Sequence, residues 1–137
     1  MMLDCRSAAP ISMVAAIQAF CELEPGRNGH RVALIGDMHL DEDESKLEHA
    51  HIGQYIAQQT NIDYLLCFGK ESSYVLKEAV KCGFPKEQAM HFDQKLTMEK
   101  VMCELLRPGD TLLIKGGRRM YLNSTIRKLF GYTVSID

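Results

Sequence analysis

Residues 31–45 read RVALIGDMHLDEDES, an apolar run that ends at Gly36 and becomes acidic immediately afterwards. The apolar residues are consecutive rather than alternating, which is typical of a strand whose two faces are both covered. A strand of this kind belongs in a parallel sheet that lies between two layers of helices. The stretch therefore predicts a buried parallel strand followed by an acidic loop.

Similar short apolar runs recur along the chain and alternate with segments of helical periodicity. The predicted strands are RVALIGD (31–37), DYLLCFG (63–69), QAMHFD (88–93) and TLLIKG (111–116), with weaker candidates at MMLDC (1–5) and YTVSID (132–137). The predicted helices cover residues 11–23, 44–59, 71–82, 96–106 and 120–130. Strands that alternate with helices indicate βαβ units. We expect one three-layer α/β domain, Rossmann-like, with a mostly parallel sheet and helices on both faces.

The composition is that of an ordinary globular domain, with 46% hydrophobic and 25% charged residues in a chain of 137. The 16 basic and 18 acidic side chains give a net charge of -2, so no polycationic surface favours nucleic acid or an anionic membrane. The five cysteines form no C-x-x-C pair, and this pattern is typical of a protein whose thiols are reduced. We expect a cytoplasmic protein with neither nucleic-acid nor membrane partners.

The acidic loop offers potential metal ligands at alternate positions, Asp37, His39 and Asp41, and G-D-x-H resembles the entry motif of binuclear metallophosphoesterases. Such enzymes need further histidines in G-N-H and G-H-x-H contexts, which this sequence lacks. His49 and His51, two residues apart on a predicted helix, should face different sides. A solvated acidic loop before a helix N-terminus, where carboxylates suit the helix dipole, is the preferred interpretation. We predict no metal site.

When the opening stretch is extended to Gly53, GDMHLDEDESKLEHAHIG (36–53) resembles a signature of the Mur ligase C-terminal domain, G-D-M-x-E-L-G-x-x-S-x-x-x-H-x-x-V/I-G. Further segments resemble the family in the same order: LDCRSAAPISM (3–13), IDYLLCFGK (62–70), HFDQK (91–95) and LRPGDTLLIKGGRRM (106–120). The resemblance is strongest to the branch that uses D-alanyl-D-alanine. It identifies residues 1–137 as a Mur ligase C-terminal domain of the glutamate-ligase type.

The resemblance implies the last domain of a three-domain ligase, which closes over a central ATPase domain. The implied reaction is ATP-dependent amide formation that joins D-alanyl-D-alanine to a UDP-muramoyl tripeptide for peptidoglycan. ATP and Mg²⁺ are then cofactors of the full-length ligase, and its central domain and a D-alanyl-D-alanine-like substrate are the partners. Because no G-x-x-x-x-G-K-[ST] loop occurs, we expect the N-terminal and central domains to be absent. The chain alone should bind neither cofactor and should be catalytically inactive.

The loop from Lys115 to Arg118 follows a predicted strand and precedes a predicted helix. In that context, backbone N–H groups and the helix N-terminus can bind an anion, and arginine can add bidentate contacts. A glycine turn with solvated cations explains the spacing equally well. The resemblance favours an anion site, in which Lys115, Gly116, Gly117 and Arg118 hold the acceptor carboxylate or contact nucleotide phosphates.

The N-terminal loop contains the main departures from the family pattern. The resemblance places Asp4 near the nucleotide ribose, and Arg6 and Ser7 complete the predicted nucleotide-binding loop. However, Arg6, Ser7 and Ala9 replace the tyrosine and two asparagines of Y-N-A-N-P, and Gly117 replaces a serine. Alanine can neither donate nor accept a side-chain hydrogen bond. Two interpretations remain open: a working ligase domain with altered acceptor contacts, or a diverged non-catalytic binding or interaction module on the same fold.

Asp37 and His49 match signature positions of the family, but no residue is predicted to be catalytic. His49 is expected to pack at the edge of its helix. Gly53 lies within a predicted helix, where glycine costs about 1 kcal/mol relative to alanine. We therefore expect Gly53 to allow close contact between this helix and the sheet.

Overall fold

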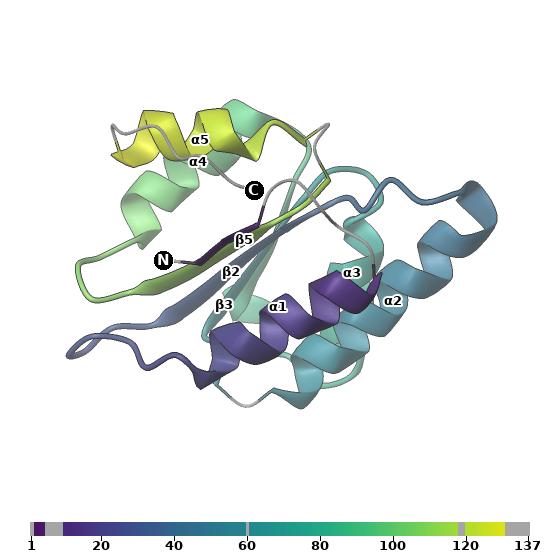
Figure 1. The fold of residues 1–137 in the computed structure, drawn as a ribbon, viewed down its shortest axis with the longest axis horizontal. Helices are drawn as coiled ribbons and strands as arrows, with labels where there is room; N and C mark the ends of the chain where they lie inside the picture. The colour runs from purple at the N-terminus through teal and green to yellow at the C-terminus, as the bar shows by residue number, and fades with distance from the viewer. Residues whose placement is uncertain (1, 5–9, 60, 118–119, 131–137) are drawn as a thin grey trace.

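The computed structural model describes residues 2–4, 10–59, 61–117 and 120–130, and Figure 1 shows how their helices and strands are arranged. The strands are β1 (Met2–Asp4), β2 (Arg31–Gly36), β3 (Tyr64–Phe68), β4 (Ala89–Phe92) and β5 (Thr111–Lys115). The helices are α1 (Pro10–Glu22), α2 (Glu42–Gln58), α3 (Ser73–Lys81), α4 (Lys95–Leu105) and α5 (Leu122–Phe130), with a 3-10 turn at Lys86–Gln88. The candidate strand at 132–137 lies outside the described residues. In the described part of the chain, no helix has the length and apolarity needed to cross a membrane.

The five strands form one sheet in the order β1-β5-β2-β3-β4, and every pairing is parallel. The chain moves in one direction across the sheet from β1 through β2 and β3 to β4, and then returns to β5. Right-handed crossovers therefore put α1, α2 and α3 on one face and α4 on the opposite face. Figure 1 shows this division, with α5 beside α4.

Alternate residues of the central strands pack against opposite helix layers. In β2, Ala33 and Ile35 belong to the cluster that contains α1, α2 and α3, whereas Val32 and Leu34 belong to the cluster that contains α4 and α5. All four side chains are fully buried. Both faces of the sheet are thus covered, which confirms the three-layer α/β fold.

A glycine caps the end of α3. Gly83 has a φ of +112°, a conformation that glycine adopts without a steric penalty. Its N–H donates to the carbonyl of Val80 at 3.1 Å, and the N–H of Phe84 donates to the carbonyl of Ala79 at 2.9 Å. These two bonds form a Schellman motif, which satisfies the last carbonyls of the helix.

Gly53 lies in α2, but its close neighbour is a helix and not the sheet. A Cβ atom on Gly53 would lie 2.3 Å from the carbonyl oxygen of Val75 and 3.0 Å from the backbone nitrogen of Ala79, both in α3. The expected helix-to-sheet contact is therefore wrong. Glycine is needed here because α2 and α3 approach each other at the backbone.

Candidate functional site

The carboxyl ends of β2 and β5 lie side by side, and the segments that follow these two strands go to opposite faces of the sheet. β2 leads to α2 on one side of the sheet, and β5 is followed by α5 on the other side (Figure 1). The strands are in register at Ile35 and Lys115, and the N–H of Gly117 donates to the carbonyl of Asp37 at 2.9 Å. Open α/β sheets bind ligands at such a switch point. The loops after β2 and β5 therefore form the candidate functional site.

Of the residues predicted to bind nucleotide or an anion, the structure describes only some, and it places Asp4 and Lys115 next to each other. Asp4, the last residue of β1, is in register with Lys115, the last residue of β5. Lys115 is fully buried, so its ammonium group is not exposed to solvent in this structure. Arg6, Ser7 and Arg118 lie outside the described residues. The predicted nucleotide-binding and anion-binding roles of these residues remain predictions.

The two glycines after β5 bring the two loops into close contact. A Cβ atom on Gly116 would lie 3.1 Å from the Cα atom of Gly36, so the two backbones nearly touch. A Cβ atom on Gly117 would lie 2.4 Å from Cδ2 of His39. Because the N–H of Gly117 already donates to Asp37, it is used within the protein and is not available to an anion.

Asp37 connects the end of β2 to the start of α3. The residue is 7% exposed, and its Oδ1 accepts a hydrogen bond from the N–H of Ser72 at 2.7 Å. Gly69, with a φ of +113°, provides space for this carboxylate, because a Cβ atom there would lie 2.5 Å from Oδ1. Asp37 is therefore an internal group at the switch point and not part of the solvated loop.

His49 is fully buried, so the expected packing at a helix edge is wrong. Its Nε2 accepts a hydrogen bond from the N–H of Met38 at 3.0 Å, which leaves the proton on Nδ1. Nδ1 donates to the carbonyl of Ser45 at 2.7 Å. His49 thus attaches the loop after β2 to α2, whereas His51 is exposed on another side of the helix, as predicted.

Glu71, in the turn between β3 and α3, joins this site although the sequence did not single it out. Its Oε2 accepts a hydrogen bond from the N–H of His39 at 3.2 Å. The ligand atoms of Asp37, His39 and Glu71 all lie within 4.8 Å of one another, whereas Asp41 is not in this group. The approach of β2 and β3 produces this cluster, which the alternation in the acidic loop did not predict.

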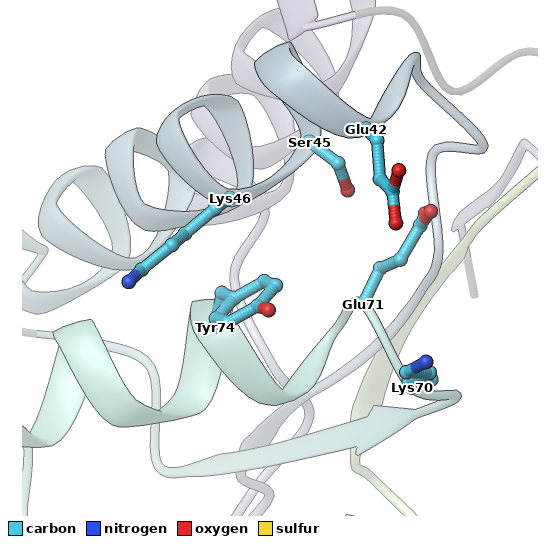
Figure 2. A pocket seen from close by; sticks show the side chains of 6 residues that line it. All are labelled: Glu42, Ser45, Lys46, Lys70, Glu71 and Tyr74. Atoms are coloured by element: carbon cyan, nitrogen blue, oxygen red, sulfur yellow. The ribbon is translucent and has the colours of Figure 1, made fainter.

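A small pocket adjoins Glu71 between α2 and α3. It is lined by Glu42, Ser45, Lys46, Lys70, Glu71 and Tyr74. Figure 2 shows the side chains of Glu42 and Glu71 pointing toward one another.

The three acidic residues of the first turn of α2, Glu42, Asp43 and Glu44, are exposed, which confirms that this part of the acidic stretch is solvated at a helix N-terminus.

Cys67, in β3 beneath this site, predicts a loss of stability at alkaline pH. Burial, and to a smaller extent the nearby charge of Asp37, raise the pKa of its thiol. The folded state therefore keeps a proton that the unfolded chain releases above about pH 8.5. Stability should fall as the pH rises past that value, by up to about 1.4 kcal/mol per pH unit. Urea denaturation between pH 7 and 10 would measure this slope.

The Cys67→Ala variant should show a smaller slope than the parent chain, whatever its stability at neutral pH. Some slope should remain, because burial also raises the pKa of Cys21. Cys103→Ala is the matched control, since Cys103 is exposed, and it should leave the slope unchanged. Equal slopes for the parent and the Cys67 variant would contradict the prediction.

A family model described as "Mur ligase, glutamate ligase domain" matches residues 1–118. The chain belongs to the Mur ligase family. This Mur ligase domain is 30% identical over 126 residues to the UDP-N-acetylmuramoyl-tripeptide--D-alanyl-D-alanine ligase of Bacillus subtilis (strain 168). That match covers 92% of this chain but 27% of the relative, so the Mur ligase domain corresponds to about a quarter of that protein.

Solved structures show the same fold for this Mur ligase domain. Crystal structure II of MurF from Acinetobacter baumannii matches with a TM-score of 0.78 at 24% identity, and covers 94% of this chain and 27% of its own. MurF ligase from Thermotoga maritima, solved in complex with ADP, matches with a TM-score of 0.69 at 18% identity, and covers 93% and 26%. These likenesses confirm the Rossmann-like three-layer architecture.

Proposed function

We propose that this chain acts as the C-terminal substrate- and nucleotide-closing domain of an ATP-dependent ligase for cytoplasmic peptidoglycan precursors. The reaction is the addition of D-alanyl-D-alanine to a UDP-muramoyl tripeptide. Chief support comes from the register of Asp4 with Lys115 at the switch point. The family resemblance assigns the nucleotide to the first of these residues and the acceptor to the second, and open sheets bind ligands at this edge.

In this proposal the domain positions reactants and does not activate them. ATP, with Mg²⁺, would activate the tripeptide carboxylate as an acyl phosphate on the central domain of the full-length ligase. Lys115 supplies the positive charge next to β1, and the Asp37–Gly117 backbone bond holds the two loops together. The partners are the central ATPase domain and a D-alanyl-D-alanine-like substrate. The net charge of -2 gives no support to a nucleic-acid partner.

A diverged, non-catalytic module on the same fold is the second candidate. Two observations favour it: Lys115 has no exposed surface, and the N–H of Gly117 is already bonded to Asp37. An anion at this loop would therefore need other donors or a rearrangement. The replaced positions Arg6, Ser7 and Ala9 point in the same direction.

A fusion protein separates the two candidates. This chain would replace the C-terminal domain of the Bacillus subtilis relative, behind that protein's own N-terminal and central domains. We expect ADP release that depends on D-alanyl-D-alanine, because the scaffold of the switch point is intact. The relative with its own C-terminal domain is the positive control, and circular dichroism would verify folding. A folded fusion without turnover would reject the ligase proposal in favour of the non-catalytic module.

A variant of the same fusion tests the acceptor site. Lys115→Met keeps most of the side-chain volume but removes the charge. A charge-assisted hydrogen bond contributes about 1.5–3 kcal/mol to binding. We therefore expect the KM for D-alanyl-D-alanine to rise at least about 10-fold in this variant. Lys100→Met, an exposed lysine of α4, is the matched control. A fall in kcat with an unchanged KM would contradict a role in acceptor binding.

A further inference from the structure

Three potential metal ligands converge at the carboxyl ends of two neighbouring strands. Asp37 and His39 follow β2, and Glu71 follows β3. Their ligand atoms all lie within 4.8 Å of one another. Two ligands on opposite sides of an ion with bonds of about 2.1 Å are about 4.2 Å apart. Small side-chain adjustments would therefore bring all three groups onto one ion.

Asp37 brings a negative charge into a nearly buried position at this point. The residue is 7% exposed, and its Oδ1 accepts a hydrogen bond from the N–H of Ser72 at 2.7 Å. Within the described ranges, no lysine, arginine or histidine forms an ion pair with it. A carboxylate in a nearly buried position is stabilised by a nearby positive charge. A cation bound to Oδ2 would supply that charge.

Gly117 provides the space that His39 occupies. A Cβ atom at position 117 would lie 2.4 Å from Cδ2 of the imidazole and 3.1 Å from the carbonyl oxygen of Asp37. The serine that the family pattern has at this position would therefore push His39 away. The N–H of His39 also donates to Oε2 of Glu71, which fixes the spacing of these two residues. Backbone contacts of this kind orient metal ligands.

We propose that Asp37, His39 and Glu71 bind one divalent transition-metal ion, of the class of Mn²⁺ or Zn²⁺. An imidazole favours these ions over Mg²⁺ and Ca²⁺, which prefer oxygen ligands alone. Three protein ligands leave coordination positions for water. The pocket beside Glu71 admits that water, and Glu42 points into it (Figure 2). The ion links the loop after β2 to the loop after β3, and its binding does not depend on the ligase activity.

Metal titration of the purified chain tests this site. The chain is first treated with a chelator and then titrated with Mn²⁺, with the free ion followed by its electron paramagnetic resonance signal. We expect one ion per chain, displacement by Zn²⁺, and a higher melting temperature with the ion bound, because a ligand that binds only the folded state stabilises it.

His39→Asn and Glu71→Gln are the informative variants. Asparagine tolerates the φ of +56° at position 39 and keeps the backbone N–H, but it removes the imidazole. Glutamine at position 71 can still accept that N–H but loses its charge. Each variant should weaken Mn²⁺ binding at least about 10-fold, a typical effect of losing a group that supports a metal. Gly117→Ser should weaken it too, by displacing His39.

His51→Asn and Glu44→Gln are the matched controls, because both residues are exposed on α2, outside the cluster. They should bind Mn²⁺ like the parent chain. Melting temperatures without metal would verify that every variant folds. The proposal is overturned if the chain binds no Mn²⁺ or Zn²⁺ up to about 1 mM, the weak end of protein metal sites. It is equally overturned if the cluster variants and the controls bind Mn²⁺ with the same affinity.

Discussion

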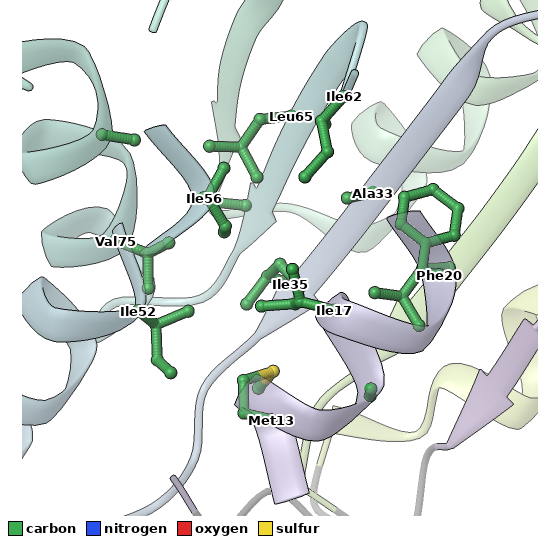
Figure 3. Packing of buried hydrophobic residues seen from close by; sticks show 14 of the residues in the cluster. Met13, Ile17, Phe20, Ala33, Ile35, Ile52, Ile56, Ile62, Leu65 and Val75 are labelled. Carbon is green, nitrogen blue, oxygen red and sulfur yellow. The ribbon is translucent and has the colours of Figure 1, made fainter. Parts of the chain in front are cut away.

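Replacing Gly53 with alanine should lower the free energy of unfolding by about 1–3 kcal/mol, the range seen for overpacked cores. Helix propensity alone predicts the opposite, since alanine is better than glycine inside a helix by about 1 kcal/mol. The added Cβ atom would lie 2.3 Å from the carbonyl oxygen of Val75, a backbone atom that cannot rotate away. Figure 3 shows Ile52 and Ile56 of α2 beside Val75 of α3, so a separation of these helices would also disturb the core.

Guanidinium denaturation of the parent and variant chains would measure this effect. Gln58→Ala is the matched control, because Gln58 is exposed in the same helix. The control should change stability by no more than about 0.5 kcal/mol. A Gly53→Ala protein as stable as the parent would mean that α2 and α3 adjust without strain, and the close approach would then not explain the glycine.

The layers of the fold could be predicted because the spacing of apolar residues along the chain indicates which faces of each strand are buried. Runs such as VALI in β2 and LLI in β5 are apolar on both faces, and this requires helices on both sides of the sheet. The predicted helices end near the observed ones because Pro25-Gly26, Gly83 and Pro108-Gly109 prevent continuation. The start of α5 shifted from the predicted residue 120 to Leu122, since the N–H of Met120 donates to the carbonyl of Gly117.

The site was predicted less completely, because it depends on the order of the strands in space. Asp37 and His49 were found through a linear motif, which sequence resemblance can detect. Glu71 lies 34 residues after Asp37, and the two meet only because β3 pairs with β2. The bond from Gly117 to Asp37 likewise follows from the insertion of β5 beside β2. No periodicity along the chain reports which strand ends become neighbours.

Replacing His49 with leucine should lower the free energy of unfolding by about 2–3 kcal/mol, although leucine fills a similar volume. The physical reason is the N–H of Met38, which donates to Nε2 of His49 in a buried position. An unsatisfied buried donor costs about 1–3 kcal/mol. The loss of the bond from Nδ1 to Ser45 adds to this cost. Chemical denaturation would give the global effect.

Hydrogen exchange at the amide of Met38 would give the local effect. In the parent chain this amide should exchange slowly. In His49→Leu it should exchange markedly faster, because its acceptor is gone, while the neighbouring strand β2 keeps its ladder. His51→Leu, at an exposed position two residues further along the helix, controls for the chemical change itself. If both variants lose the same stability and Met38 stays protected, His49 contributes to packing alone. If only the His49 variant loses stability and protection at Met38, the imidazole of His49 attaches the loop that holds Asp37 and His39. This family-signature histidine would then be a positioning residue.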